Sequence, residues 1–196
     1  MSRLLFSRRF CIKALACSYA ALQTMSFMPN VAHAASTTLV LYFSHTGNTR
    51  KLANMIHERV NSDILEVTTK IPYPKDHDTV VAQAKREQQN AVRPALAIDL
   101  KKLDGYTTIF LGYPNWWGTM PMPLFTLLEQ HDFGTAEILP FCTHGGSRLG
   151  DSVRDIKKLC PKAHVRKGFA VFGKQVDQAG ANLDAWLSSQ KIQTKR

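Results

Sequence analysis

The stretch VLYFSHTGNT at residues 40–49 joins a buried strand to the start of a helix. The run from Thr38 to Phe43 is apolar almost throughout, as expected for a strand covered on both faces. A loop rich in hydroxyl groups follows, and Leu52, Ile56 and Val60 then recur at the spacing of a helix that starts near Thr49. A strand, a tight loop and a helix in this order indicate one unit of an α/β protein.

The same unit repeats along the rest of the chain. Further strands are predicted at residues 64–67, 107–112, 138–142 and 169–172. Helices are predicted near 79–90, from 121–123, after Leu149, and at the end of the chain, where Leu183, Trp186 and Leu187 face inward. The charged run 85–87 is interpreted as a solvated helix face. Alternation of this kind predicts one α/β domain, at 35–196, with a parallel sheet covered by helices on both sides.

Pro140 conflicts with its predicted central strand, because proline has no N–H to donate to the sheet. We therefore expect a local bulge there, or a position at which the missing N–H would face no partner.

Residues 1–34 are predicted to be an export signal. They combine a basic start, a short apolar stretch at 14–22, and Ala32 and Ala34 at a cleavage site before Ala35. The apolar stretch is far shorter than the ~20 residues that cross a bilayer, so no stable membrane anchor is expected. The segment SRRFCIK at residues 7–13 resembles the twin-arginine signal S-R-R-x-F-L-K, which implies export of a folded protein to the periplasm. The alternative is an ordinary secretory signal.

Removal of that signal would leave Cys142 and Cys160 as the cysteines of the mature chain. The first is predicted at the end of a strand and the second at the far end of the next helix. Such a helix is ~20 Å long, whereas a disulfide needs Cα atoms within ~7 Å. Two free thiols are therefore expected.

The chain is basic, with a net charge of +10. Residues 1–34 hold four basic residues and no acid, so the remainder carries +6. No run of Lys and Arg marks a nucleic-acid groove, and a cationic surface is the interpretation. The seven histidines form no cluster with cysteine or carboxylate ligands, so no metal site is predicted.

Three loops follow predicted strands at the edge where ligands of open parallel sheets bind. The first, at 44–49, offers hydroxyls, Gly47 and the free N–H groups of a helix start to a phosphate. The second, at 112–119, holds adjacent Trp116 and Trp117, which cannot both point into a core, so at least one should lie at the surface. In the third, Gly145 and Gly146 allow close backbone approach to a ligand.

These loops resemble those of the flavodoxin family. Residues 40–56 are similar to the flavodoxin signature, GYPNWWGT at 112–119 to the G-Y-P-x-W-W-G-T loop of one subfamily, and PFCTHGGSR at 140–148 to its P-F-C-T-S-G-G-S-G stretch. His144 and Arg148 replace Ser and Gly of that stretch. The resemblance implies a doubly wound five-stranded parallel sheet of order 2-1-3-4-5 that binds flavin mononucleotide (FMN).

The resemblance also implies the residues that hold FMN. The first loop would bind the phosphate, and the other two would flank the flavin ring. The residues concerned are Ser44, His45, Thr46, Gly47, Asn48, Thr49, Pro114, Asn115, Trp116, Trp117, Gly118, Thr143, His144, Gly145, Gly146 and Ser147. The alternatives are a hydroxyl-rich helix cap at the first loop and indoles packed against the protein itself at the second. A cation at His144 or Arg148 would favour the reduced, anionic flavin, unless both side chains turn to solvent.

The resemblance implies a single-domain electron carrier, because flavodoxins shuttle electrons between larger redox proteins. A basic carrier is expected to meet a redox partner with an acidic face. The alternatives are an FMN-dependent reductase that oxidises NAD(P)H or reduces quinone-like substrates, and a flavin-free binding module on the same fold. No catalytic residues are predicted.

Overall fold

The computed structural model describes residues 37–195. The export signal predicted at 1–34 lies outside these residues. The described chain forms a parallel sheet in the order β2-β1-β3-β4-β5, and β6 also pairs with β4. This arrangement confirms the predicted fold class and strand order. The strands are β1 Thr38–Tyr42, β2 Asp63–Glu66, β3 Thr108–Pro114, β4 Glu137–His144, β5 His164–Val165 and β6 Phe169–Phe172.

The last edge of the sheet differs from the prediction, because two short strands replace one. β5 pairs with Glu137 and Ile138 of β4, and β6 pairs with β4 from Phe141 onward. The N–H of Arg166 donates to Ile138 O at 2.9 Å. The backbone polar groups of Ile138 and Pro140, two residues apart, point to the same edge of β4, so those of Pro140 also point toward β5 and β6. Pro140 therefore lies opposite the break between β5 and β6. Neither short strand has a register partner for Pro140, which fits a position where a missing N–H is tolerated.

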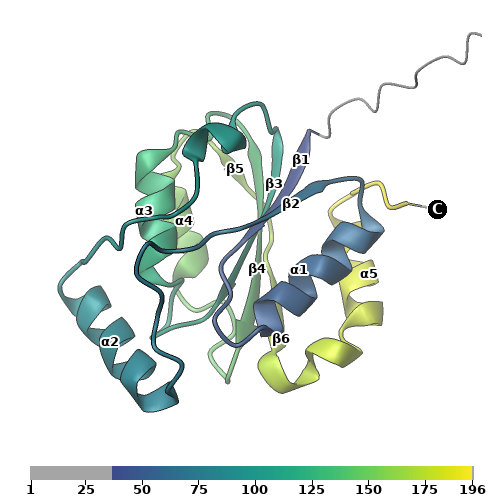
Figure 1. The fold of residues 1–196 in the computed structure, drawn as a ribbon. Coiled ribbons are helices and arrows are strands. Elements are labelled where there is room, and N and C mark those ends of the chain that lie inside the picture. Colours follow the sequence, from purple (N-terminus) through teal and green to yellow (C-terminus); the bar gives the residue numbers. More distant parts are fainter. Residues whose placement is uncertain (1–36, 196) are drawn as a thin grey trace, which may run out of the picture. The chain divides into compact units, whose positions relative to one another are not determined.

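Helices cover both faces of the sheet (Figure 1). α1 (Asn48–Arg59) and α5 (Gly180–Ser189) pack on one face, where Leu52, Ile56, Leu183 and Leu187 contact a core that includes Val40. α3 (Met122–Gln130) and α4 (Ser152–Leu159) cover the other face, whose core includes Leu39. Adjacent residues of β1 thus point to opposite cores, as the pleat of a strand requires. The predicted burial of Leu183, Trp186 and Leu187 is confirmed.

α2 (His77–Gln89) stands apart from these layers, at the end of the sheet where α1 begins (Figure 1). Short 3₁₀ helices precede β3 (η1, Leu100–Leu103) and follow β6 (η2, Gly173–Gln178). The interpretation of 85–87 as a solvated face is wrong at Glu87, which is only 8% exposed. Its carboxylate accepts hydrogen bonds from the hydroxyl of Tyr73 and the amide of Gln83, and these bonds explain the burial.

Cys142 on β4 and Cys160 at the end of α4 are free, buried thiols. Burial raises the pKa of Cys142 to about 12 and that of Cys160 to about 11. Among residues 37–195, no helix has the length and apolar character needed to cross a membrane.

Candidate functional site

The three predicted loops meet at one cavity of about 500 Å³ beyond the carboxyl ends of the strands. Its size falls within the range of small-molecule and cofactor sites, roughly 300–1,000 Å³. Ten of the predicted residues line it: His45, Thr46, Asn48, Pro114, Asn115, Trp116, Trp117, Thr143, His144 and Gly145. The structure therefore brings parts of all three loops together. Ser44, Gly47, Thr49, Gly118, Gly146 and Ser147 belong to the same loops but do not line the cavity.

The first loop is shaped by Gly47, whose φ of 91° lies in the left-handed region that glycine adopts without strain. Gly47 caps α1 without a side-chain hydrogen bond of its own, so the Asn48 and Thr49 N–H groups of the first turn are positioned to meet an anion. The Thr49 hydroxyl is buried and lies 2.8 Å from the hydroxyl of Thr143, which ties the first loop to the third. Ser44 Oγ accepts a hydrogen bond from the Arg50 N–H.

Trp116 forms the inner aromatic wall of the cavity. Its ring makes edge contacts with Phe43, Tyr73 and His45, with centroids 5.5, 5.2 and 5.8 Å away. These contacts leave Trp116 partly buried within an aromatic cluster. Trp117, by contrast, is 48% exposed, which confirms that one of the two indoles lies at the surface.

Asn115 joins the second loop to the third. Its Nδ2 atom donates to the Arg148 carbonyl at 2.8 Å, and its Oδ1 atom accepts from the Gly118 N–H at 3.0 Å. Gly118 has a φ of 85° and its carbonyl accepts from the Asp151 N–H at 2.7 Å. Gly118 therefore holds the two loops in register from outside the cavity.

The third loop presents a neutral imidazole. His144 Nδ1 accepts a hydrogen bond from the Gly146 N–H at 3.0 Å, which a protonated Nδ1 could not do. Burial lowers the pKa of His144, and the nearby Arg148 lowers it further. Both observations disfavour a cation at His144. Arg148 is exposed and does not line the cavity, and Ser147 contributes its carbonyl to a turn with the Gly150 N–H.

Two further segments that were not predicted complete the cavity. His77, Val80, Val81 and Ala84 of α2 form one wall, and residues 172–174 (Phe-Gly-Lys) after β6 form another. The second segment could have been found, because it follows a strand at the same edge of the sheet as the other loops. The polar composition of α2 concealed the first.

The lining residues carry positive or neutral side chains. Lys174 and three histidines line the cavity, whereas none of the lining residues is acidic. Burial lowers the pKa of His45, and its neighbour His77 lowers it further. Among residues 37–195, no group of three or more His, Cys, Asp or Glu is placed to hold a metal ion.

These features fit a flat aromatic cofactor with an anionic tail. The Asn48 and Thr49 N–H groups at the start of α1, together with Thr46, suit the anion. Pro114, Trp116 and the backbone at Gly145, beside which a Cβ would meet no atom within 4 Å, suit the edges of a ring. An open parallel sheet with such a cavity at its carboxyl edge defines a flavodoxin-like α/β protein.

The family model described as flavodoxin matches residues 37–190, so the chain belongs to the flavodoxin family. A comparison with curated proteins finds no significant match.

Solved structures agree with the family. A protein of Bacteroides eggerthii that is classed as a flavoprotein is 28% identical, with a TM-score of 0.67, and the match covers 80% of this chain and 98% of that one. A Lactobacillus acidophilus flavoprotein in complex with FMN is 27% identical, with a TM-score of 0.60 and coverages of 74% and 98%. The family and this complex support FMN, the cofactor predicted from the sequence.

Proposed function

We propose that this protein binds FMN in the cavity and acts as a single-domain electron carrier. The observation that carries the proposal is the convergence of the first, second and third loops on one cavity that suits both an anion and a flat ring. When bound, FMN supplies the redox chemistry of its ring system, and the protein supplies binding, orientation and control of access.

Each part of the site has a distinct task in this proposal. Thr46 and the N–H groups at the start of α1 bind the phosphate, where the helix dipole favours negative charge. Trp116 and the backbone at Gly145 lie along the ring. Val80, Val81 and Ala84 exclude water from the ring on the side of α2.

A carrier is favoured over an independent catalyst by what the cavity offers. The described residues that line it include no carboxylate pair and no cysteine nucleophile. Chemistry that uses such groups independently of the flavin is therefore not supported at this cavity, whereas hydride transfer to the flavin needs neither group and is separated from electron carriage by the turnover test below.

The direct test is to purify the chain without residues 1–34, record its visible spectrum, titrate it with FMN, and then titrate it with reductant. We expect a yellow 1:1 complex that takes up electrons reversibly and does not turn over with NAD(P)H alone. A colourless protein that ignores FMN would support the binding module instead. Rapid oxidation of NAD(P)H without a partner would support the reductase.

We further propose a redox partner with an acidic face. The exposed cations Lys85 and Lys174 lie near the cavity, and the lining itself holds no acid. Attraction between opposite charges raises association rates at low salt and is screened as the Debye length falls. Electron transfer to an acidic acceptor protein should therefore slow as ionic strength rises, and rates indifferent to salt would contradict this part of the proposal.

The proposed site of action is the periplasm, reached by the twin-arginine pathway with FMN already bound. The support is the SRRFCIK segment and the small residues before Ala35. Replacing Arg8 and Arg9 by Lys should retain the protein in the cytoplasm, as measured by fractionation. Normal export of that variant would favour an ordinary secretory signal.

A further inference from the structure

α2 meets the rest of the protein through two adjacent strips of its surface. Val80, Ala84 and Glu87 recur at helical spacing and are buried, and the first two line the cavity. The second strip follows the first by one residue along the helix and consists of Val81, Lys85 and Gln88. All three residues of this second strip contact Trp117.

The contacts to Trp117 are of three kinds. Its Nε1–H donates to the Val81 carbonyl at 3.1 Å, and its own carbonyl accepts from Gln88 Nε2 at 3.1 Å. Lys85 Nζ lies 4.9 Å from the centroid of the indole, as in a cation–π interaction. Residues of α2 thus contact the half-exposed Trp117 at three places: its ring face, its ring nitrogen and its backbone carbonyl.

The backbone of Trp117 is held in a conformation that a bulky residue rarely adopts. Its φ is 51°, in the left-handed region. Strain of this kind persists only where surrounding contacts maintain it. The contacts available to maintain it are those with α2 and the turn in which Trp116 and Thr119 exchange backbone hydrogen bonds.

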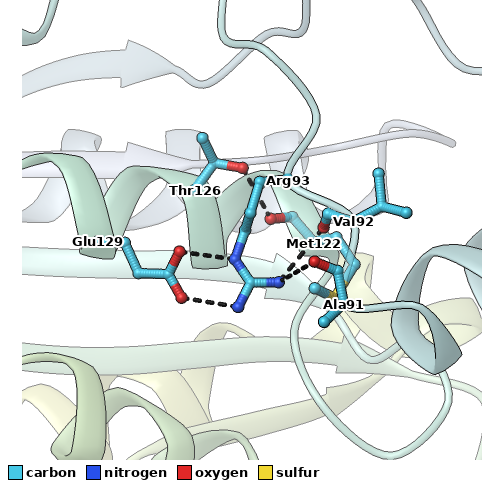
Figure 2. A network of polar contacts seen from close by, with 6 residues as sticks. All are labelled: Ala91, Val92, Arg93, Met122, Thr126 and Glu129. Atoms are coloured by element: carbon cyan, nitrogen blue, oxygen red, sulfur yellow. Dashed lines mark hydrogen bonds and ion pairs between the residues drawn. The ribbon is translucent and has the colours of Figure 1, made fainter.

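Contacts that do not involve Trp117 cap the start of α2 and tie the chain beyond its end to α3. At the start, the Asp76 carboxylate accepts hydrogen bonds from the Thr79 N–H and hydroxyl. Beyond the end, Arg93 forms a two-pronged ion pair with Glu129 of α3, at 2.6 and 2.7 Å, and donates to the Ala91 carbonyl (Figure 2). Between these points, Trp117 contacts α2 from Val81 to Gln88, a stretch that includes part of the cavity wall.

We propose that α2 is the cover of the FMN cavity and that Trp117 is the positioning residue that holds this cover in place. In this assignment the inner residue, Trp116, lies along the flavin ring, while Trp117 controls how readily FMN leaves. The inference rests on the proposed function for the identity of the ligand. The contacts between Trp117 and α2 do not depend on the identity of the ligand.

The test uses Trp117→Gly, because glycine accepts a positive φ and only the indole is lost. Hydrogen–deuterium exchange of the apoprotein reports the opening of α2, and stopped-flow release reports the FMN dissociation rate. We expect exchange within residues 77–89 and FMN release each to accelerate roughly tenfold, the factor that corresponds to the net loss of one or two hydrogen bonds. Exchange within β1, β3 and β4 should stay unchanged.

Two further variants separate the contacts. Trp117→Phe keeps a ring beneath Lys85 but removes the bond to Val81, and should give a smaller acceleration of both rates. Lys85→Ala removes the cation, and its matched control is Arg86→Ala, since Arg86 is the neighbouring exposed cation on the same helix. We expect Lys85→Ala to accelerate exchange within α2 about twofold or more and Arg86→Ala to leave it at the wild-type rate.

The outcomes distinguish the cover from direct stacking. If Trp117→Gly speeds FMN release but leaves exchange within α2 unchanged, Trp117 stacks on the flavin and the inference is overturned. Unchanged exchange and unchanged release would also overturn it. If the wild-type protein binds no FMN, the proposed function fails, whereas the exchange of α2 in the apoprotein still decides whether Trp117 holds the helix.

Discussion

The first and second loops reach the same cavity but are stabilised in different ways. The first loop places a glycine, Gly47, where the chain needs a positive φ, and its shape follows from local sequence. The second loop places a tryptophan, Trp117, at such a position, in a turn that has local bonds from Asn115 and further bonds from α2. A loop of the first kind can be recognised in the sequence, whereas the second also depends on contacts with residues far along the chain.

The largest expected loss of stability is at Gly150, where the atoms nearest to an added Cβ all belong to the second loop. A Cβ at Gly150 would lie 2.0 Å from the Gly118 carbonyl oxygen, and its φ is 52°. Gly150→Ala should lower the free energy of unfolding by about 3–5 kcal/mol, the sum of backbone strain and overpacking. Urea denaturation measures this loss. Gly105→Ala is the matched control, because its φ of 85° is also positive but a Cβ there meets nothing within 4 Å. Equal losses in the two variants would contradict the packing argument.

The buried Glu87 tests the dependence of the second loop on α2. Glu87→Ala removes the acceptor for Tyr73, whose ring packs against Trp116, and should lower the free energy of unfolding by about 2 kcal/mol. Glu87→Gln retains an acceptor and should lose less than half as much. Thermal or urea unfolding of both variants measures the difference. A neutral Glu87→Ala would mean that α2 is held without this carboxylate.

The hydrogen bond between the Thr49 and Thr143 hydroxyls tests how far the stability of the first loop depends on contacts outside it. Thr49→Val removes one buried partner at nearly constant volume and should lower the free energy of unfolding by about 1 kcal/mol. Thr46→Val, at an exposed position, is the control for stability. A loss as large as that of Gly150→Ala would show that the first loop also depends on distant contacts.

The smallest expected effect is a pH dependence shared by the first and third loops. Burial lowers the pKa values of His45 and His144, so the folded state binds their protons less tightly than the unfolded state does. Their contribution to stability is therefore complete above the unfolded pKa of about 6.5 and is lost as pH falls below it. Because both side chains keep contact with solvent, each should account for less than about 1 kcal/mol.

Urea midpoints at about pH 7.5 and about pH 5.5, on either side of the unfolded pKa, measure this effect. His144→Asn keeps an acceptor for the Gly146 N–H and should flatten the dependence. A steeper dependence in that variant would assign the effect to other groups.

Most strands could be predicted because they are apolar runs bounded by turn residues, as at Thr38–Tyr42, whereas the strand order followed from the resemblance to the flavodoxin family. The first loop could be predicted for the same local reason. The split between β5 and β6 could not, because it depends on which residues lie opposite Pro140. The α2 wall escaped prediction because Val80 and Ala84 sit among polar residues, and the burial of Glu87 depends on Tyr73, a partner in the preceding loop.

The two buried thiols of the described chain bear on how this protein could operate on either side of a membrane. With pKa values of about 12 and about 11, fewer than roughly one in 10³ of either would be thiolate at pH 7. Neither cysteine is poised for exchange with glutathione or with an oxidising enzyme. Burial and the raised pKa values thus disfavour thiol–disulfide exchange at either cysteine, so export after folding, as proposed above, would call for no covalent rearrangement.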